Sequence, residues 1–179
     1  IPVTSLPGPA ACITALTLSG LPTRRFCFEA FLPTDKKERQ WILEELKQET
    51  RTMIVYEAPH HLVRTLEELG TALGMDRRLT LCRELTKRYE EAYQSTFAEA
   101  LQRFETEEPK GECVIVIEGR SIEDLKREQQ KSWEEMSLED HMEVYLAQGI
   151  DRKEAMKKVA KDRGISKRDV YQGLMEREG

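Results

Sequence analysis

The chain has 179 residues, a net charge of −5 and a hydrophobic fraction of 39%. That apolar content suffices for one domain with a small appendage, and no apolar run approaches the length that crosses a membrane. The acidic balance excludes a uniformly basic nucleic-acid-binding surface, so any contact with nucleic acid must be local. The cysteines lie in apolar patterns without metal-ligand spacing, which indicates reduced core residues of a cytosolic protein; they are Cys12, Cys27, Cys82 and Cys113.

Residues 6–11 read Leu-Pro-Gly-Pro-Ala-Ala and lead into an apolar stretch. Proline suits the first position of a helix, because the N–H that it lacks would be unpaired there. With only glycine and alanine around them, the free amides of this first turn could bind a ligand at close range. A helix start that packs against a crowded sheet is the alternative explanation.

Between residues 26 and 117, short strand patterns alternate with helical ones. Near-continuous apolar strands separated by helices are typical of a sheet covered on both faces. We therefore predict an α/β domain over 1–120, with α-β-α layers and a mixed sheet. The expected strands are 26–31, 52–56, 79–82, 91–96 (an edge strand) and 113–117, and the expected helices are 36–47, 61–73 and 98–104.

Three of the core strands end in a glutamate: Glu57, Glu84 and Glu118. If these strands are parallel, the three carboxylates share the edge of the sheet at which ligands bind in open α/β folds. The alternative is that they only cap the helices that follow. The segment 83–87, Arg-Glu-Leu-Thr-Lys, holds the densest cluster of reactive side chains. His60 and His61 have no further ligand at metal-binding spacing, so no metal site is predicted.

Residues 121–136 are expected to form a linker or an exposed helix, and 137–179 a unit of three short helices that resembles a helix-turn-helix. Ser137, Asp151 and Ser166 fit helix N-caps, because an acidic residue follows each of them three positions later. Gly149 and Gly164 stand where the first two of these helices should end.

A basic surface on this helical unit contrasts with the acidic balance of the chain. Such a patch predicts phosphate contact and therefore RNA binding, whereas a solvated face on a small bundle is the alternative. The residues are Arg152, Lys153, Lys157, Lys158, Lys161, Arg163, Lys167 and Arg168.

Six segments, in this order, carry a family resemblance: 6–11, 20–22, 28–33, 51–60, 83–87 and 110–119. They resemble the ribosomal RNA small subunit methyltransferase I family, within the tetrapyrrole-methylase superfamily of S-adenosylmethionine-dependent enzymes. The resemblance covers nearly the whole chain and implies the second domain of the tetrapyrrole-methylase fold. It implies 2′-O-methylation of a cytidine ribose in small-subunit ribosomal RNA, with the 30S particle as partner. It also implies a bacterial cytoplasmic homodimer without membrane contact.

The resemblance also implies the cofactor contacts. No glycine-rich N-terminal half of the cofactor cleft is present in this sequence, so we expect a fragment that is inactive alone and whose partner is the missing N-terminal domain. The contacts with S-adenosyl-L-methionine carried over by motif are Pro9, Ala10, Ala11, Tyr56, Glu57, Leu85 and Gly119, with Glu84 in the same loop as Leu85.

Methyl transfer from a sulfonium requires alignment of the attacking oxygen and removal of its proton. Glu84, or Lys87 if burial neutralises it, could take that proton, and the sequence does not choose between them. Arg83 suits a phosphate or ribose contact, because a guanidinium binds phosphate through two donors. A tetrapyrrole methyltransferase would share the cofactor half but should lack the basic appendage. A pure nucleic-acid-binding module would not explain the glutamates at the ends of the core strands.

Overall fold

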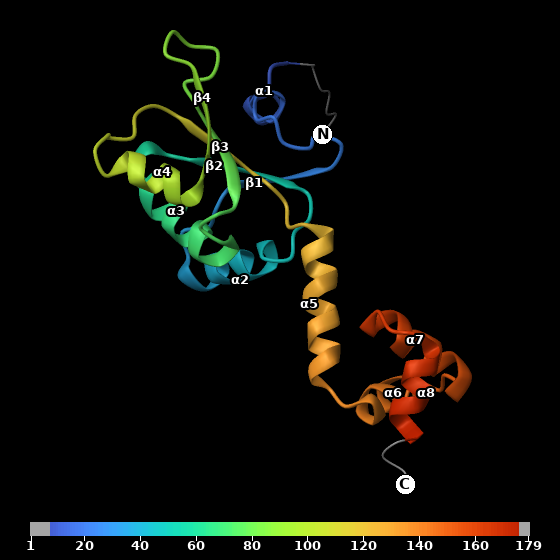
Figure 1. The fold of residues 1–179 in the computed structure, drawn as a ribbon. Coiled ribbons are helices and arrows are strands. Elements are labelled where there is room, and N and C mark those ends of the chain that lie inside the picture. The colour runs from blue at the N-terminus through green and yellow to red at the C-terminus, as the bar shows by residue number, and fades with distance from the viewer. Residues whose placement is uncertain (1–7, 176–179) are drawn as a thin grey trace, which may run out of the picture. The chain divides into compact units, whose positions relative to one another are not determined.

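The computed structural model describes residues 8–175, which divide into two compact units between Arg120 and Ser121 (Figure 1). Each unit has its own hydrophobic core. Across the described residues, no helix combines the length and the apolar character that a membrane crossing requires.

The first unit is built on a five-stranded sheet in the order β1-β2-β5-β3-β4. Strand β1 is parallel to β2, whereas β5 is antiparallel to both of its neighbours, β2 and β3, and β4 is antiparallel to β3. The mixed α/β fold predicted from the sequence is confirmed. The strands are β1 (Phe26–Phe31), β2 (Thr52–Glu57), β3 (Arg78–Arg83), β4 (Glu91–Thr96) and β5 (Cys113–Ile117).

Helices cover both faces of this sheet (Figure 1). Helix α1 (Ala11–Leu18) packs on the face that carries Ile54 and Val116. Helices α2 (Lys36–Leu46), α3 (Pro59–Leu73) and α4 (Phe97–Phe104) pack on the face that carries Val55 and Ile115. Successive strand residues point to opposite faces, so each apolar strand contributes side chains to the hydrophobic clusters on both faces of the sheet.

The second unit consists of α5 (Ile122–Glu135), α6 (Leu138–Leu146), α7 (Arg152–Arg163) and α8 (Lys167–Met175). The segment expected to be a linker or an exposed helix is helix α5, and none of its residues is buried. It contacts α7 and α6: the Gln130 amide donates to the Arg163 carbonyl at 2.9 Å, and the Trp133 ring stacks on His141 with 4.0 Å between centroids.

The predicted helix boundaries of the second unit are confirmed. The side-chain oxygens of Ser137, Asp151 and Ser166 accept hydrogen bonds of 2.9–3.1 Å from amides of the following turn. Gly149 and Gly164 have φ values of +79° and +66°, which only glycine adopts without strain, and they follow α6 and α7.

Candidate functional site

Strands β1, β2 and β3 end at the same side of the sheet, which we call the carboxyl edge. Strand β1 is parallel to β2, and β2 and β3 run the same way because both are antiparallel to β5 between them. Phe31, Glu57 and Glu84 therefore follow or finish three strands at one edge. Two of the three strand-ending glutamates thus stand at one edge of the sheet, with β5 between their strands.

Glu118 and Gly119 lie at the opposite edge, which corrects the prediction that all three glutamates share one side. The cause is the reversed direction of β5, which an apolar run does not reveal. The Glu118 carboxylate accepts hydrogen bonds from Arg78 at 2.8 and 3.1 Å. A Cβ atom on Gly119 would lie 2.2 Å from the Thr50 carbonyl oxygen, so close backbone approach explains this glycine. The structure does not bring Gly119 to the other predicted cofactor contacts.

Helix α1 begins at the carboxyl edge. Its second residue, Cys12, packs in one cluster with Tyr56 and Leu85, which flank that edge. Beyond its other end, the Ser19 carbonyl accepts a 2.9 Å bond from Thr80, near the start of β3. The structure thus brings Cys12, at the start of α1, next to Tyr56, and Leu85 packs against the same core cluster. The first residues of the predicted motif, up to Pro7, lie outside the described residues.

The start of α1 is open and uncapped. Pro9, Ala10 and Ala11 are exposed, and the N-cap residue Ala10 offers no side-chain oxygen to the first amides. A Cβ atom added to Gly8 would meet nothing within 4 Å. Uncapped amides with small side chains around them suit a polar or negatively charged group of a ligand.

Three aromatic rings form an exposed cluster beside this helix start. The Phe28 and Phe31 rings pack edge-on against Tyr56, with centroids 4.9 and 5.7 Å apart, and are 47% and 61% exposed. Residues three apart in a regular strand would face opposite ways. Here a bulge between Phe28 and Ala30 brings both rings to one face, and Ala30 adopts a left-handed φ of +52°. Burial and hydrogen bonding to the Cys12 thiol raise the pKa of Tyr56.

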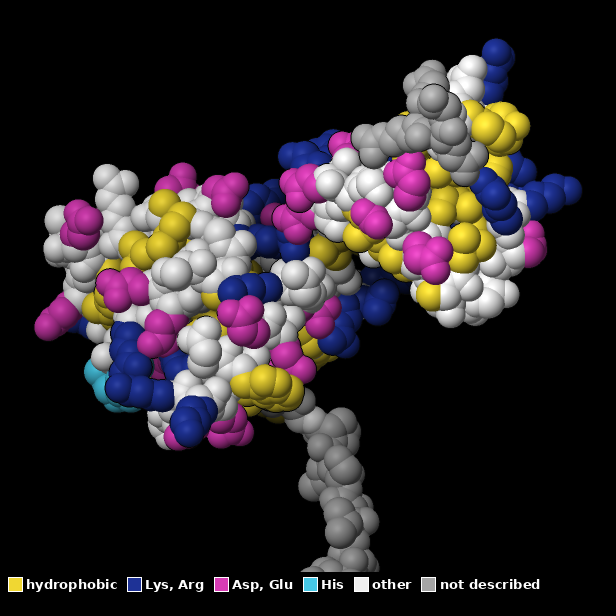
Figure 2. Space-filling view, turned by 90° about the horizontal axis from the view of Figure 1, so that it is seen from below, with side chains coloured by type: hydrophobic (Ala, Val, Ile, Leu, Met, Phe, Trp, Pro, Cys, Tyr) yellow, Lys and Arg dark blue, Asp and Glu magenta, His cyan; other side chains and the backbone are white. Residues whose placement is uncertain are grey.

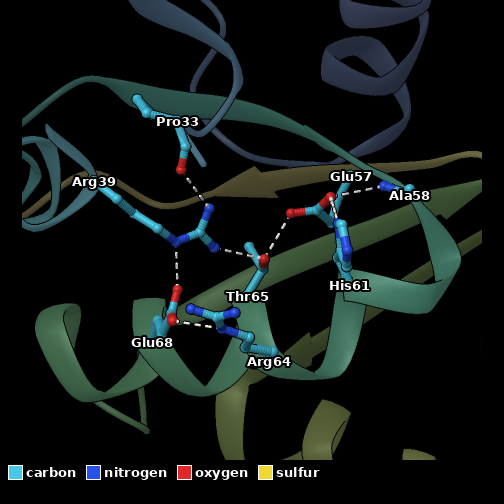
Figure 3. Close-up of polar contacts among 8 residues, drawn as sticks. All are labelled: Pro33, Arg39, Glu57, Ala58, His61, Arg64, Thr65 and Glu68. Carbon is cyan, nitrogen blue, oxygen red and sulfur yellow. Dashed lines mark hydrogen bonds and ion pairs between the residues drawn. The ribbon is translucent and has the colours of Figure 1, made fainter. Parts of the chain in front are cut away.

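Glu57 belongs to the other face of the sheet. It is 7% exposed, and its carboxylate accepts bonds from the Ala58 amide at 2.8 Å and the Thr65 hydroxyl at 2.6 Å. Figure 3 shows Arg39 continuing this network, since its guanidinium donates to Thr65 at 2.8 Å and to Glu68 at 2.5 Å. These bonds fasten α2 and α3 to the end of β2, so the Glu57 side chain is separated by the sheet from Tyr56 and α1.

Arg39, Glu57 and Thr65 of this network line a pocket of about 430 Å³ together with His60 and His61. The two imidazole rings lie 4.1 Å apart, and His61 Nδ1 lies 3.9 Å from the Glu57 carboxylate. Within residues 8–175 there is no group of three or more potential metal ligands.

The loop after β3 holds the two candidate bases. The Lys87 ammonium donates to the carboxylates of Glu84 and Glu112, both at 3.2 Å, and its side chain is half exposed. These bonds raise the pKa of Lys87, and the bond from Lys87 is the main cause that lowers the pKa of Glu84. Neutralisation of Lys87 by burial, the condition for its role as a base, is therefore not met.

The backbone of this loop is unusual at two residues. Glu84 and Thr86 have φ values of +49° and +64°, which side chains other than glycine rarely adopt. A Cβ atom on the neighbouring Gly111 would lie 2.3 Å from a Glu84 carboxylate oxygen, so the glycine makes room for that side chain. Such conformations concentrate at functional sites, where the surrounding structure holds them.

Arg83 does not lie with these groups. Its guanidinium donates to the Glu91 carboxylate at 2.5 Å, and Glu91 also accepts a bond from Arg103 at 2.8 Å. The three side chains line a pocket on the face of the sheet that α4 covers. A guanidinium already held by a carboxylate is less available to a phosphate, so the RNA contact predicted for Arg83 stays a prediction.

The residues of the predicted basic surface on the second unit differ in what they contact. Lys157 forms an ion pair with Glu154 at 2.9 Å, and the Lys158 ammonium lies 5.5 Å from the centre of the Tyr145 ring. Arg152, Lys153 and Lys167 line a groove between α7 and α8. Lys161 and Arg168 do not line that groove.

Arg163 is 9% exposed, which corrects its placement on the basic surface. Its guanidinium donates to His141 Nδ1 at 3.1 Å and to the carbonyls of Met136 and Ser137 at 2.5 and 2.9 Å. These acceptors come from the start of α6, far from Arg163 in the sequence. Helix periodicity alone could not identify them.

Sequence reasoning missed two exposed aromatic features. The strand pattern places Phe28 and Phe31 in a strand but does not reveal the bulge that turns both rings to one face. Tyr171, which is 52% exposed, lies one helical turn after Lys167 in α8.

Comparison with known proteins adds to this geometry. Residues 1–101 match the family model of the tetrapyrrole (corrin/porphyrin) methylases. The chain is 44% identical, over 171 residues, to the ribosomal RNA small subunit methyltransferase I of Halalkalibacterium halodurans, covering 96% of this chain and 58% of that protein. It is 42% identical, over 178 residues, to the protein of the same name from Synechocystis sp., covering 99% of this chain and 62% of that protein.

Among solved structures, the methyltransferase CobJ is similar with a TM-score of 0.46 and 20% identity, covering 65% of this chain and 52% of that chain. The present chain spans about three fifths of the length of the two curated relatives.

Proposed function

Because the chain belongs to the tetrapyrrole (corrin/porphyrin) methylase family, we propose that it forms part of an S-adenosyl-L-methionine-dependent methyltransferase. The proposed reaction is methylation of the 2′-oxygen of a cytidine ribose in small-subunit ribosomal RNA, in a bacterial cytoplasm. The names of the two curated relatives support a ribosomal RNA substrate. A further domain of the same protein, the 30S particle and a second copy of the chain are the proposed partners.

The observation that carries this proposal is the contact of Cys12, at the start of α1, with Tyr56 at the carboxyl edge, where Leu85 packs against the same core cluster. This arrangement fits a nucleoside-containing cofactor, since the uncapped amides can donate hydrogen bonds to a polar group and the half-buried Tyr56 ring can pack against a flat base. S-adenosyl-L-methionine supplies an activated methyl group when it is bound. Residues Pro9 to Ala11, Tyr56 and Leu85 would form one wall of its pocket.

The loop after β3 would handle the proton of the attacking hydroxyl. Glu84 is the better candidate of the two, because its carboxylate is ionised and can accept a proton without first losing one, although its lowered pKa makes it a weak base. Lys87 would first have to lose a proton that two carboxylates hold, since its bonds to Glu84 and Glu112 raise its pKa. Lys87 would instead orient Glu84, and a bound hydroxyl would compete with it for the carboxylate.

The test is transfer of a radiolabelled methyl group to 30S particles by the full-length protein. A label on a 2′-oxygen leaves one phosphodiester resistant to alkali, because the blocked oxygen cannot attack the adjacent phosphate. We expect an alkali-resistant labelled dinucleotide. A label found on a base, or transferred to a tetrapyrrole and not to RNA, would contradict the proposed reaction.

A matched pair of variants tests the role of Glu84. Glu84→Gln should lower kcat by about 10²- to 10⁴-fold, the usual contribution of a general base. Glu112→Gln removes the other carboxylate that contacts Lys87, at the same 3.2 Å distance, and should leave kcat nearly unchanged. Equal effects of the two substitutions would exclude Glu84 as the base.

A further inference from the structure

A groove between α7 and α8 combines an apolar floor with a basic rim. Its volume is about 460 Å³, and its floor is formed by Met156, Leu174 and Met175. Tyr171 also lines the groove and is 52% exposed, so its ring is accessible to a ligand. Figure 2 shows hydrophobic side chains gathered beside lysine and arginine side chains on the second unit.

The cations at the rim are available for a ligand. Arg152, Lys153 and Lys167 line the groove, and their side chains take part in no ion pair with another residue between 8 and 175. Lys157, on the same helix as two of them, is by contrast paired with Glu154. Counting only residues 8–175, the groove therefore presents three cations outside any ion pair, together with an exposed aromatic ring.

We propose that this groove binds an unpaired nucleotide of single-stranded RNA, with its base stacked on Tyr171 and its phosphates at Arg152, Lys153 and Lys167. A base stacked on an aromatic ring, with the backbone held by cations, is how proteins bind single-stranded nucleic acid. The proposal rests on the proposed ribosomal RNA substrate and adds a second contact on that RNA, apart from the methylated ribose.

The chemistry of the groove favours a nucleotide over an acidic amphipathic helix of a protein. A groove for such a helix would have a long apolar stripe that matches residues one turn apart over several turns. Here the lining holds only three aliphatic side chains, Met156, Leu174 and Met175, and as many cations. A single flat base with its flanking phosphates matches this size and charge.

The test compares binding of a short oligocytidine RNA and of the same oligomer with abasic sites, using the full-length protein. The wild-type protein should bind the oligocytidine more tightly. Tyr171→Ala should weaken oligocytidine binding by at least about fivefold and abolish the preference over the abasic oligomer. Tyr171→Phe keeps the ring and should keep the preference.

Charge variants provide the matched control. Lys153→Gln should lower the salt dependence of binding, since each phosphate contact releases counterions. Lys161→Gln removes one lysine of the same helix that does not line the groove, and it should leave the base preference unchanged. Circular dichroism of each variant checks that the helices are retained.

Two results separate the failure of this proposal from that of the proposed function. If Tyr171→Ala retains the wild-type base preference, or the abasic oligomer binds as tightly as oligocytidine, the groove is not a nucleotide site and the methylation proposal stands. If the protein methylates no RNA and binds no oligomer even at low salt, both proposals fail. Capture of an acidic helical peptide by the groove, with no RNA competition, would also overturn the nucleotide proposal.

Discussion

Tyr56 and Glu57 are consecutive residues of β2 that serve opposite faces of the sheet. Tyr56 lies on the α1 face, where burial and the Cys12 thiol raise its pKa, whereas the Glu57 carboxylate accepts a 2.6 Å bond from Thr65 of α3. A ligand at the start of α1 would therefore contact Tyr56. Glu57 instead stabilises the opposite face of the sheet by binding α3. Function and stability should respond separately to changes at these two residues.

Loss of the Thr65 hydroxyl should destabilise the first unit without affecting cofactor affinity. Thr65→Val leaves the buried Glu57 carboxylate and one Arg39 donor with one partner fewer, which should cost about 1–3 kcal/mol of unfolding free energy. Urea unfolding measures this loss. Thr71→Val, at an exposed position of the same helix, should change stability by less than about 0.5 kcal/mol. A similar loss from both variants would show that the buried network contributes nothing.

Ala30→Gly should stabilise the protein. Ala30 has a φ of +52°, and the left-handed region costs a residue with a Cβ atom about 1–2 kcal/mol relative to glycine. After the entropy that glycine loses on folding, a net gain of about 1 kcal/mol is expected. The control, Ala98→Gly in α4, should instead destabilise by about 0.5–1 kcal/mol. Destabilisation by Ala30→Gly would mean that the bulge does not need this conformation.

The stability of the second unit should fall at mildly acidic pH. His141 is fully buried and accepts a bond from Arg163 on Nδ1, and burial and the Arg163 charge lower its pKa from 6.5. Below about pH 6.5 the unfolded chain binds a proton that the folded unit resists, so stability is complete above that pH and declines as the pH falls.

Trp133 reports this change directly, because its ring stacks on His141. In a Trp41→Phe background it is the sole tryptophan of the chain. The unfolding free energy measured by Trp133 fluorescence should fall between pH 7 and pH 5. In His141→Gln this free energy should depend less on pH. An unchanged pH dependence in His141→Gln would assign the effect to other groups.

The lysines outside the groove should contribute to particle binding through charge alone. Replacing Lys157, Lys158 and Lys161 with glutamine should weaken binding to 30S particles and reduce its salt dependence, with the loss shrinking as salt rises. Cofactor affinity should stay unchanged, since the three residues belong to the second unit. Normal particle binding with an unaltered salt slope would make this face a solvated surface only.

Features fixed by neighbouring residues could be predicted from the sequence, whereas those set by distant partners could not. The caps at Ser137 and Asp151 depend on amides in the next turn, and sequence spacing revealed them. The side of the sheet at which Glu118 emerges depends on the direction of β5, which an apolar strand pattern does not encode. Burial of Arg163 depends on acceptors more than twenty residues away, at Met136 and His141.

The candidate site shows the same division. The small residues before α1 and the strand end at Tyr56 stood out in the sequence, and the structure places Cys12, the second residue of α1, beside Tyr56. The bulge that places Phe28 and Phe31 on one face depends on a left-handed alanine, which no local rule favours.

Cofactor affinity of an Ala10 variant tests the central claim most directly. Ala10→Leu in the full-length protein places a bulky side chain at the exposed start of α1, and calorimetry with S-adenosyl-L-methionine measures the effect. We expect a loss of about 1–3 kcal/mol, or about 5- to 150-fold in Kd, with unchanged thermal stability. Ala98→Leu, at an exposed position in the first turn of α4 on the opposite edge, is the matched control and should bind as the wild type does. Wild-type affinity in Ala10→Leu, or an equal loss in both variants, would contradict a cofactor pocket at the start of α1.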